Sequence, residues 1–198
     1  MAKIGLSKPY FAKYSNTGET VTYSDCALMG KAVELTIELD GADDNILYAD
    51  NGPAESDNQF AGGSMKLTTD DLLPEVMVSV LGIVKEEMEV DGVTTEGAAW
   101  YKFNDAQVTP YGGFGAVVMV KNGGVPGYQA VVLPKIQFTN PADNFKTKGE
   151  TVEWGTPEIE ATILRDDTAK HEWKRISTPL ATEAEAEAAI KAFFGATA

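Results

Sequence analysis

Residues 31–40 carry the pattern that most constrains the fold of this chain. Four aliphatic residues stand at every second position, and polar residues fill the positions between them. Successive side chains of a β-strand point to opposite faces, so this period of two predicts a strand with one aliphatic and one acidic face. We expect the aliphatic face to be core and the acidic face to meet water or a water-filled space. The aliphatic residues are Val33, Leu35, Ile37 and Leu39, and the polar residues are Glu34, Thr36, Glu38 and Asp40.

Further strand signals recur along the chain and predict a mainly β fold. Glu158 and Glu160 alternate with aliphatic residues, which predicts a second strand with one acidic face. The runs 116–120 and 131–133 are apolar at every position, so we expect burial on both faces by a second sheet, a helix or a neighbouring subunit. The other predicted extended segments are 4–23 with a turn at 15–18, 45–48, 59–68, 115–121 and 128–139 joined by a turn at 122–127, and 151–165 with a break at 155–157; 50–58 is predicted as a polar loop.

Two segments carry helix signals. Residues 68–71 offer N-cap oxygens, Pro74 fits only a first turn, and Gly82 fits the position after the last turn, which predicts a short helix that packs on the sheet. Residues 182–185 read as a capping box, and Gly195 ends a second helix that has one apolar stripe. The residues of that stripe are Ala186, Ile190, Phe193 and Phe194.

The chain has 198 residues, which suits one domain with a sizeable core. We predict a single domain over 1–198: an antiparallel β-sandwich or barrel with a short flanking helix, a long loop at about 83–113, and a C-terminal helical arm at about 180–198. Residues 90–93 predict a two-residue hairpin turn within the loop. A connection of that length is uncommon inside a compact domain unless it has a function.

The charge of the chain argues against several classes of function. Asp plus Glu is 30 and Lys plus Arg is 16, so the net charge is −14. Such a surface repels phosphate, and nucleic-acid binding without sequence preference needs Lys and Arg, so we expect no binding of DNA or RNA. No apolar run approaches the roughly 20 residues of a membrane span, and no export signal is evident at the N-terminus.

Catalytic, cofactor and metal sites are not predicted. Cys26 and His171 are the single residues of their types, so neither an internal disulfide nor a Cys/His zinc cage is expected. Nucleotide-binding loops and the nucleophile elbow are lacking, and carboxylate pairs such as Glu158 and Glu160 follow from strand alternation alone. Two minor alternatives stay open, a calcium site and an aromatic platform for sugars. The acidic cluster, which does not match an EF-hand loop, is Asp40, Asp43, Asp44, Asp50, Glu55 and Asp57, and the aromatic residues are Trp100, Tyr101 and Trp154.

An ordered combination of short segments carries a family resemblance. The first group is NILYADNG at 45–52, FAGGSMKL at 60–67 and TDDL at 69–72; the second is PYGGFG at 110–115, GYQA at 127–130, LPKIQF at 133–138 and KTKGE at 146–150, and IGLSKPY at 4–10 fits as well. In this order the chain resembles the major tail protein, or tail tube protein, of long non-contractile-tailed bacteriophages and related prophages. The resemblance spans nearly the whole chain and lies in the combination rather than in any one motif.

The resemblance implies a structural virion protein. In that family, packed antiparallel sheets with a flanking helix form rings of six copies, and the rings stack into a hollow tube whose inner strands close into one barrel. The tube encloses the tape measure protein and later conducts DNA to the host, without specific binding. Tail terminator and distal tail proteins are the further implied partners, and assembly takes place in the cytoplasm of the bacterial host. No enzymatic activity, cofactor or membrane contact is implied.

The resemblance gives the acidic faces and the long loop candidate roles. An acidic wall lets DNA slide because like charges do not bind, so the predicted lumen-facing residues are Glu34, Glu38, Asp40, Glu158 and Glu160. The alternative is that they face the outer solvent. In that family the extended loop and terminal arms bridge adjacent rings, and the candidate inter-ring residues are Asp91, Gly92, Trp100 and Tyr101. The competing functions are a β-sandwich carbohydrate-binding or adhesion module of a phage or cell surface, and an enzyme.

Overall fold

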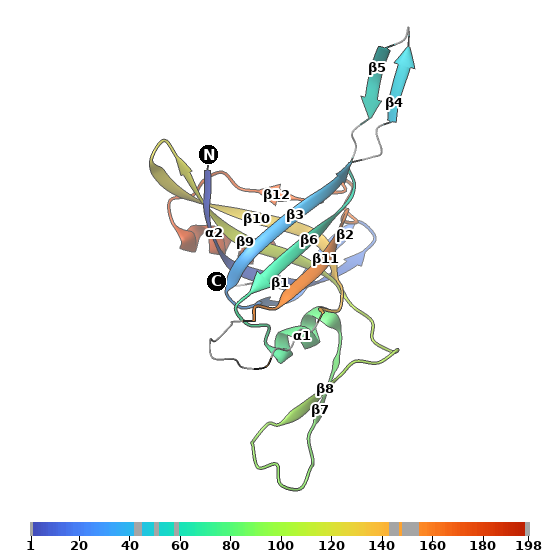
Figure 1. Ribbon diagram of the computed structural model, residues 1–198. Coiled ribbons are helices and arrows are strands. Elements are labelled where there is room, and N and C mark those ends of the chain that lie inside the picture. Colours follow the sequence, from blue (N-terminus) through green and yellow to red (C-terminus); the bar gives the residue numbers. More distant parts are fainter. Residues whose placement is uncertain are drawn as a thin grey trace.

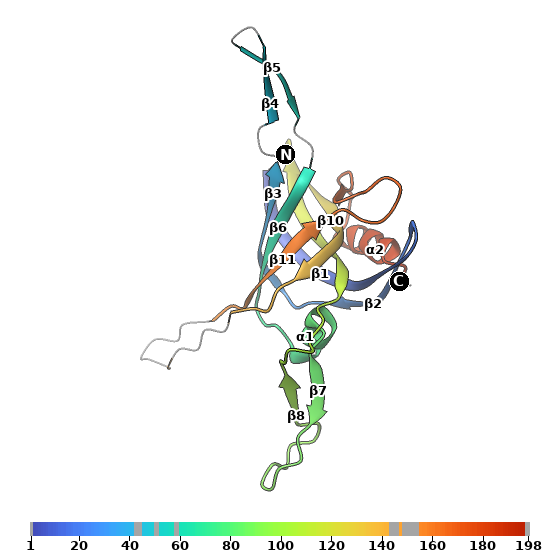
Figure 2. The ribbon, with the colours of Figure 1, turned by 90° about the vertical axis from the view of Figure 1, so that its right-hand side faces the viewer.

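The structure is a computed structural model that describes residues 2–41, 45–49, 52–57, 60–142, 147 and 155–196. Eight strands form one antiparallel sheet, in the order β2-β1-β9-β10-β11-β6-β3, with β12 paired to β10 beside that path (Figure 1). Two further strand pairs are hairpins that project from opposite ends of the body (Figures 1 and 2). The predicted mainly β, antiparallel fold with two helices is confirmed.

The elements have the following bounds. The strands of the sheet are β1 (Ala2–Thr17), β2 (Thr20–Leu28), β3 (Ala32–Gly41), β6 (Phe60–Thr69), β9 (Tyr111–Asn122), β10 (Val125–Phe138), β11 (Glu158–Leu164) and β12 (Arg175–Ile176). The hairpins are β4 (Asn45–Ala49) with β5 (Gly52–Asp57), and β7 (Val84–Glu87) with β8 (Ala99–Lys102). The helices are α1 (Pro74–Leu81) and α2 (Glu183–Phe193).

The main core lies inside the strongly curved sheet. Apolar side chains from β6 and β11 meet those from β1, β9 and β10 in one buried cluster, and α1 closes the cluster at one end (Figure 2). Val80 and Leu81 of α1 are fully buried. The largest buried residues of the cluster are Phe11, Met29, Met65, Leu67, Leu81, Phe114, Leu133, Ile136, Ile159 and Ile163.

A second core lies on the outer face of β1, β9 and β10, where α2 packs. Ile190 and Phe194 are buried there against Val117 and other apolar residues of the sheet. The central strands β9 and β10 therefore have core on both faces. This confirms the double burial predicted for 116–120 and 131–133 except at Met119, which is half buried, and identifies a helix as the outer cover. Close contact explains the glycines of β9, since an ideal Cβ on Gly115 would stand 2.6 Å from Cγ2 of Ile190.

The two helices begin in different ways. At α2 the predicted capping box forms: the Thr182 hydroxyl accepts from the Glu185 N–H, and the Glu185 side chain accepts from the Thr182 N–H. At α1 the predicted N-cap at 68–71 is wrong, because β6 continues through Thr69 and the Asp70 carboxylate accepts from the backbone N–H of Lys31 at 2.8 Å. Leu73 takes the N-cap position instead, ahead of Pro74, and Gly82 ends α1 at a φ of 69° as predicted.

Two loop predictions are corrected. The polar loop predicted at 50–58 contains β5, which pairs with β4. The long loop predicted at 83–113 is shorter, because Ile83 is buried in the core and β9 begins at Tyr111. Within it a turn forms at 90–93, where the Val93 N–H donates to the Val90 carbonyl at 3.0 Å, but this turn lies at the tip of a long loop between β7 and β8 rather than joining them directly.

The aliphatic face of β3 is only half buried. Leu35 and Ile37 pack against the main core, as predicted, whereas Val33 and Leu39 are 56% and 44% exposed. The reason is the position of β3, which is the last strand of the sheet order and has β6 as its neighbour on one side only. Alternation thus predicts the orientation of these side chains but not how far the opposite layer extends over them.

Candidate functional site

The five predicted lumen-facing carboxylates lie on one face of three adjacent strands. Strand β6 pairs with β3 on one side and with β11 on the other, so residues as far apart in the sequence as Glu34 and Glu158 flank the same strand. In this register Glu34 and Glu158 both stand opposite Thr68. We call this surface the acidic face; its carboxylates are Glu34, Glu38, Asp40, Glu158 and Glu160, and all five are exposed.

One lysine lies in the middle of the acidic face. Lys66 of β6 has its Nζ 2.5 Å from a carboxylate oxygen of Glu160 and 3.6 Å from one of Glu158. The hydrogen bond to Glu160 raises the pKa of Lys66, so the ammonium stays charged. Exposed ion pairs of this kind add little stability. The face keeps a net negative charge, since it carries five carboxylates and Lys66 pairs with only two of them.

The sheet has two exposed edge strands. Among the described strands, β2 pairs with β1 alone and β3 pairs with β6 alone. Every residue of β2 is exposed or half exposed, and Leu28 at its end is 41% exposed. An edge of this length presents a row of backbone N–H and C=O groups that is a template for another chain. The sheet is therefore able to continue into a neighbouring molecule.

The hairpin of β7 and β8 stands clear of the body and divides the candidate inter-ring residues (Figures 1 and 2). Asp91 and Gly92 lie exposed at the tip, and Trp100 is 54% exposed on β8. Tyr101 lies on the opposite face of β8, half buried against the main core. Tyr101 thus anchors the base of the hairpin, and only the other three residues are available to a neighbour.

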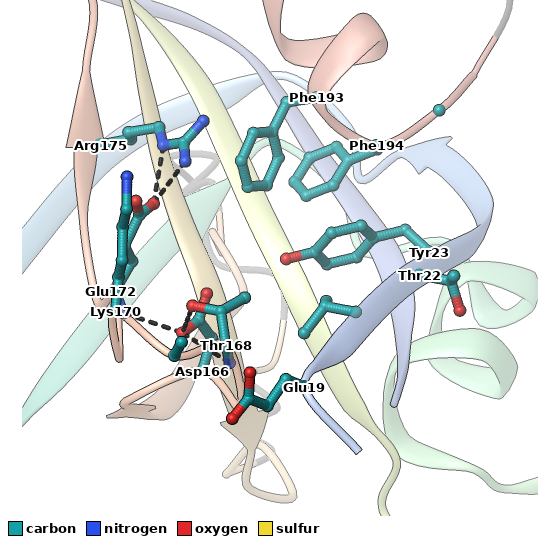
Figure 3. Close-up of a pocket in the computed structure, with 13 residues that line it drawn as sticks. Glu19, Thr22, Tyr23, Asp166, Thr168, Lys170, Glu172, Arg175, Phe193 and Phe194 are labelled. Atoms are coloured by element: carbon teal, nitrogen blue, oxygen red, sulfur yellow. Dashed lines mark hydrogen bonds and ion pairs between the residues drawn. The ribbon is translucent and has the colours of Figure 1, made fainter. Parts of the chain in front are cut away.

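A cavity of about 780 Å³ lies between β2, the end of α2 and the segment from 166 to 175 (Figure 3). Its aromatic wall contains Tyr23, Phe193 and Phe194. On the opposite wall the Arg175 Nε donates to Glu172 at 2.8 Å, while the guanidinium lies 5.0 Å from the centre of the Phe193 ring. Arg175 and Glu172 are thus paired with each other, and this contact stabilises one wall of the cavity.

Buried hydrogen bonds hold the segment that forms this wall. The Asp166 carboxylate is almost fully buried and accepts from the Thr168 hydroxyl at 2.7 Å and from the Glu172 N–H at 2.8 Å. The Asp167 carboxylate accepts from the Lys135 ammonium at 2.6 Å and from the Tyr14 hydroxyl at 2.7 Å. Both bonds lower the pKa of Asp167, and the bond from Lys135 has the larger effect. None of these residues was predicted from the sequence to form a cluster. An Asp two positions before a Thr just after a strand is typical of a side-chain-to-backbone turn, and that signal could have indicated it.

The remaining candidates do not form a reactive site in the described part of the chain. Cys26 packs beside the α2 core, and burial raises the pKa of its thiol, which is the opposite of the change that activates a nucleophile. His171 lies in the connection between β11 and β12, with Nδ1 3.3 Å from the Asp166 carbonyl oxygen. Among the described residues, no group of three or more His, Cys, Asp or Glu side chains is placed to hold a metal ion.

Several members of the minor alternatives lie outside the described residues. These are Asp43, Asp44 and Asp50 of the acidic cluster and Trp154 of the aromatic group. Of the other aromatic residues, Trp100 and Tyr101 are consecutive on β8 and therefore face opposite sides, so they do not form one platform.

Two comparisons with known proteins find no match. A scan against protein-family models finds no family that matches this chain, and a search of curated proteins finds no match. Over the residues that the structure describes, neither helix has the length and apolar character needed to cross a membrane.

Proposed function

We propose that this protein is the subunit of a hollow tube, the tail tube of a long non-contractile-tailed bacteriophage. The observation that carries the proposal is the open sheet, whose terminal strands β2 and β3 are long, exposed and each paired on one side only among the described strands. Such edges promote aggregation unless they meet a partner. Pairing between copies satisfies the edge groups and closes a barrel across subunits, with no edge left open.

The acidic face supports the proposal because it adjoins one of these edges. Strand β3 is both an edge strand and the carrier of Glu34, Glu38 and Asp40. Continuing the sheet through β3 in a ring repeats the acidic face around a common axis. In the tube this face lines the bore, where it repels the phosphates of passing DNA and allows the molecule to slide.

The projecting hairpin supports stacking of rings. It carries several exposed apolar side chains on a segment that has left the body, and apolar surface of this kind marks contact with another protein. The exposed residues are Val84, Val90, Val93, Trp100 and Phe103, with Val108 in the following loop. In this proposal the hairpin bridges neighbouring rings, the bore holds the tape measure protein before DNA, and terminator and distal tail proteins close the ends of the tube in the virion.

Electron microscopy tests the proposal directly. The purified full-length chain, concentrated and viewed by negative stain, is expected to form rings or tubes with a central hole. A chain that remains monomeric at high concentration and is retained on a glycan array would instead support the carbohydrate-binding or adhesion module.

The acidic face has its own test in a variant with Glu158→Lys and Glu160→Lys. Tubes of that variant are expected to bind double-stranded DNA in a filter assay, more weakly as salt increases, because new cations on the wall release counterions from the phosphates. The matched control carries Glu19→Lys and Asp105→Lys, which change the charge equally at exposed positions outside the acidic face and outside the tip of the β7–β8 hairpin. Equal DNA binding by the two variants would contradict the assignment of the acidic face to the bore.

A further inference from the structure

A second cavity, of about 390 Å³, opens where the curved sheet stays unclosed between β3 and the N-terminal half of β1. Its floor is apolar, and Val118 and Val131 there are nearly buried. Its rim is apolar and exposed to solvent, since Val33 is 56% and Ile176 is 52% exposed. We call this cavity the seam groove.

The seam groove carries positive charge in a strongly negative protein. Lys3 and Lys174 line it, with Glu34 as the facing carboxylate. Neither lysine forms an ion pair with any described residue, and burial together with the nearby Lys3 charge lowers the pKa of Lys174. A groove with two lysines and one carboxylate, in a chain of net charge −14, favours an acidic segment with apolar side chains.

The tip of the β7–β8 hairpin has this chemistry. Residues 87–98 contain four carboxylates and no Lys or Arg, and none of the four forms an ion pair with a described residue. Val90 and Val93 flank the turn within this acidic tip and are 50% and 41% exposed. The carboxylates are those of Glu87, Glu89, Asp91 and Glu96.

We infer that the β7–β8 tip of one copy occupies the seam groove of a second copy. Within one chain this contact does not form, since the hairpin leaves the body beyond α1, away from β12 and the N-terminal end of β1 (Figures 1 and 2). Two different surfaces of the same chain then meet, and a contact of this type repeats into an open stack rather than closing in a dimer. The inference rests on the proposed tube and names the surface that receives the hairpin.

Charge reversal tests the contact on the full-length chain. The groove variant carries Lys3→Glu and Lys174→Glu, the tip variant carries Glu89→Lys and Asp91→Lys, and a third variant combines them. We expect each reversal to raise the protein concentration needed for stacking by about tenfold or more, because like charges then face each other across the contact. The combined variant is expected to return to within about threefold of the unmodified protein, as coupled sites do in a double-mutant cycle. The control is Lys170→Glu, a single reversal at an exposed lysine away from the groove.

Cross-linking tests the contact without relying on charge. In a Cys26→Ser background, Val90→Cys with Ile176→Cys is expected to give a ladder of covalent oligomers under oxidising conditions. Val90→Cys with Thr162→Cys, which is exposed on the acidic face, is the control and gives none. Circular dichroism of every variant confirms that the fold is kept.

The outcomes separate this inference from the proposed function. Unmodified protein that forms neither rings nor tubes contradicts both. Normal stacking of the groove variant contradicts the inference alone and leaves the tube in place. So does a combined charge variant that stays as defective as its parents, together with the lack of a ladder from the Val90→Cys, Ile176→Cys variant.

Discussion

Truncating Ile190 to alanine tests whether α2 is an integral part of the fold. The Ile190 side chain is fully buried between α2 and the outer face of β9. The contact is close, because a Cβ added to Gly115 would lie only 2.6 Å from Cγ2 of Ile190. Ile190→Ala removes three carbons, worth roughly 0.8 kcal/mol each by transfer, or about 2.4 kcal/mol. The cavity left behind adds to this, so we expect a loss of about 3 kcal/mol in the free energy of unfolding.

Thermal and guanidinium denaturation followed by circular dichroism measure this loss. For a domain of this size, 1 kcal/mol shifts Tm by roughly 2–4 °C, so Ile190→Ala should lower Tm by about 6–12 °C. Ala189→Ser, at the exposed neighbouring position, is the control and should change the free energy of unfolding by less than about 0.5 kcal/mol. A loss below about 1 kcal/mol for Ile190→Ala would refute the packing argument and indicate that α2 leaves the sheet in solution, as an arm shared between copies does.

Three further predictions concern the same packed helix. Gly115→Ala forces a methyl group against Ile190 and should cost about 1–3 kcal/mol in unfolding experiments, a value below about 0.5 kcal/mol being inconsistent with the close contact. Thr182→Ala removes the cap of α2 and should cost about 1 kcal/mol, whereas Thr182→Ser should keep most of the stability. Hydrogen bonds from Lys191 and, second, from Tyr10 lower the pKa of Glu187 to about 2 from its ordinary 4.5. The ionised Glu187 carboxylate therefore stabilises the fold above pH 4.5, and this stability is lost as pH falls towards 2. Glu187→Gln should therefore flatten the pH dependence of Tm in that window, and an unchanged acid profile would contradict this assignment.

The acidic face shows how local prediction and long-range pairing combine. Alternation alone placed Glu34 and Glu38 on one side of one strand and Glu160 on one side of another. Their meeting on a single surface depends on β6, which pairs with both strands in one register. Nothing in the two separate patterns specifies that shared neighbour, because backbone pairing is the same chemistry for any two strands.

The hairpin candidates show the opposite case. Asp91 and Gly92 are exposed at a turn, as the local turn signal predicted, and that signal needs only the residues of the turn itself. Trp100 and Tyr101 are adjacent aromatic residues with the same intrinsic preference for burial, yet one is exposed and the other packs on the core. Only the position of β8 relative to the body decides which side of the strand is covered.

Features that depend on neighbouring residues could be predicted from the amino-acid order alone: the alternating strands, the capping box at Thr182, the turn between β9 and β10, and the φ of Gly82. Other features required the packing of distant segments: the order of the strands, the strand β5, the helix that covers the outer face of β9, and the exposure of Val33 at the sheet edge. The division has a physical cause. Hydrophobic periodicity and helix caps depend on residues that are close in the sequence. Strand pairing and burial depend instead on distant segments, because the chain selects the packing that costs least conformational entropy and removes most apolar surface from water.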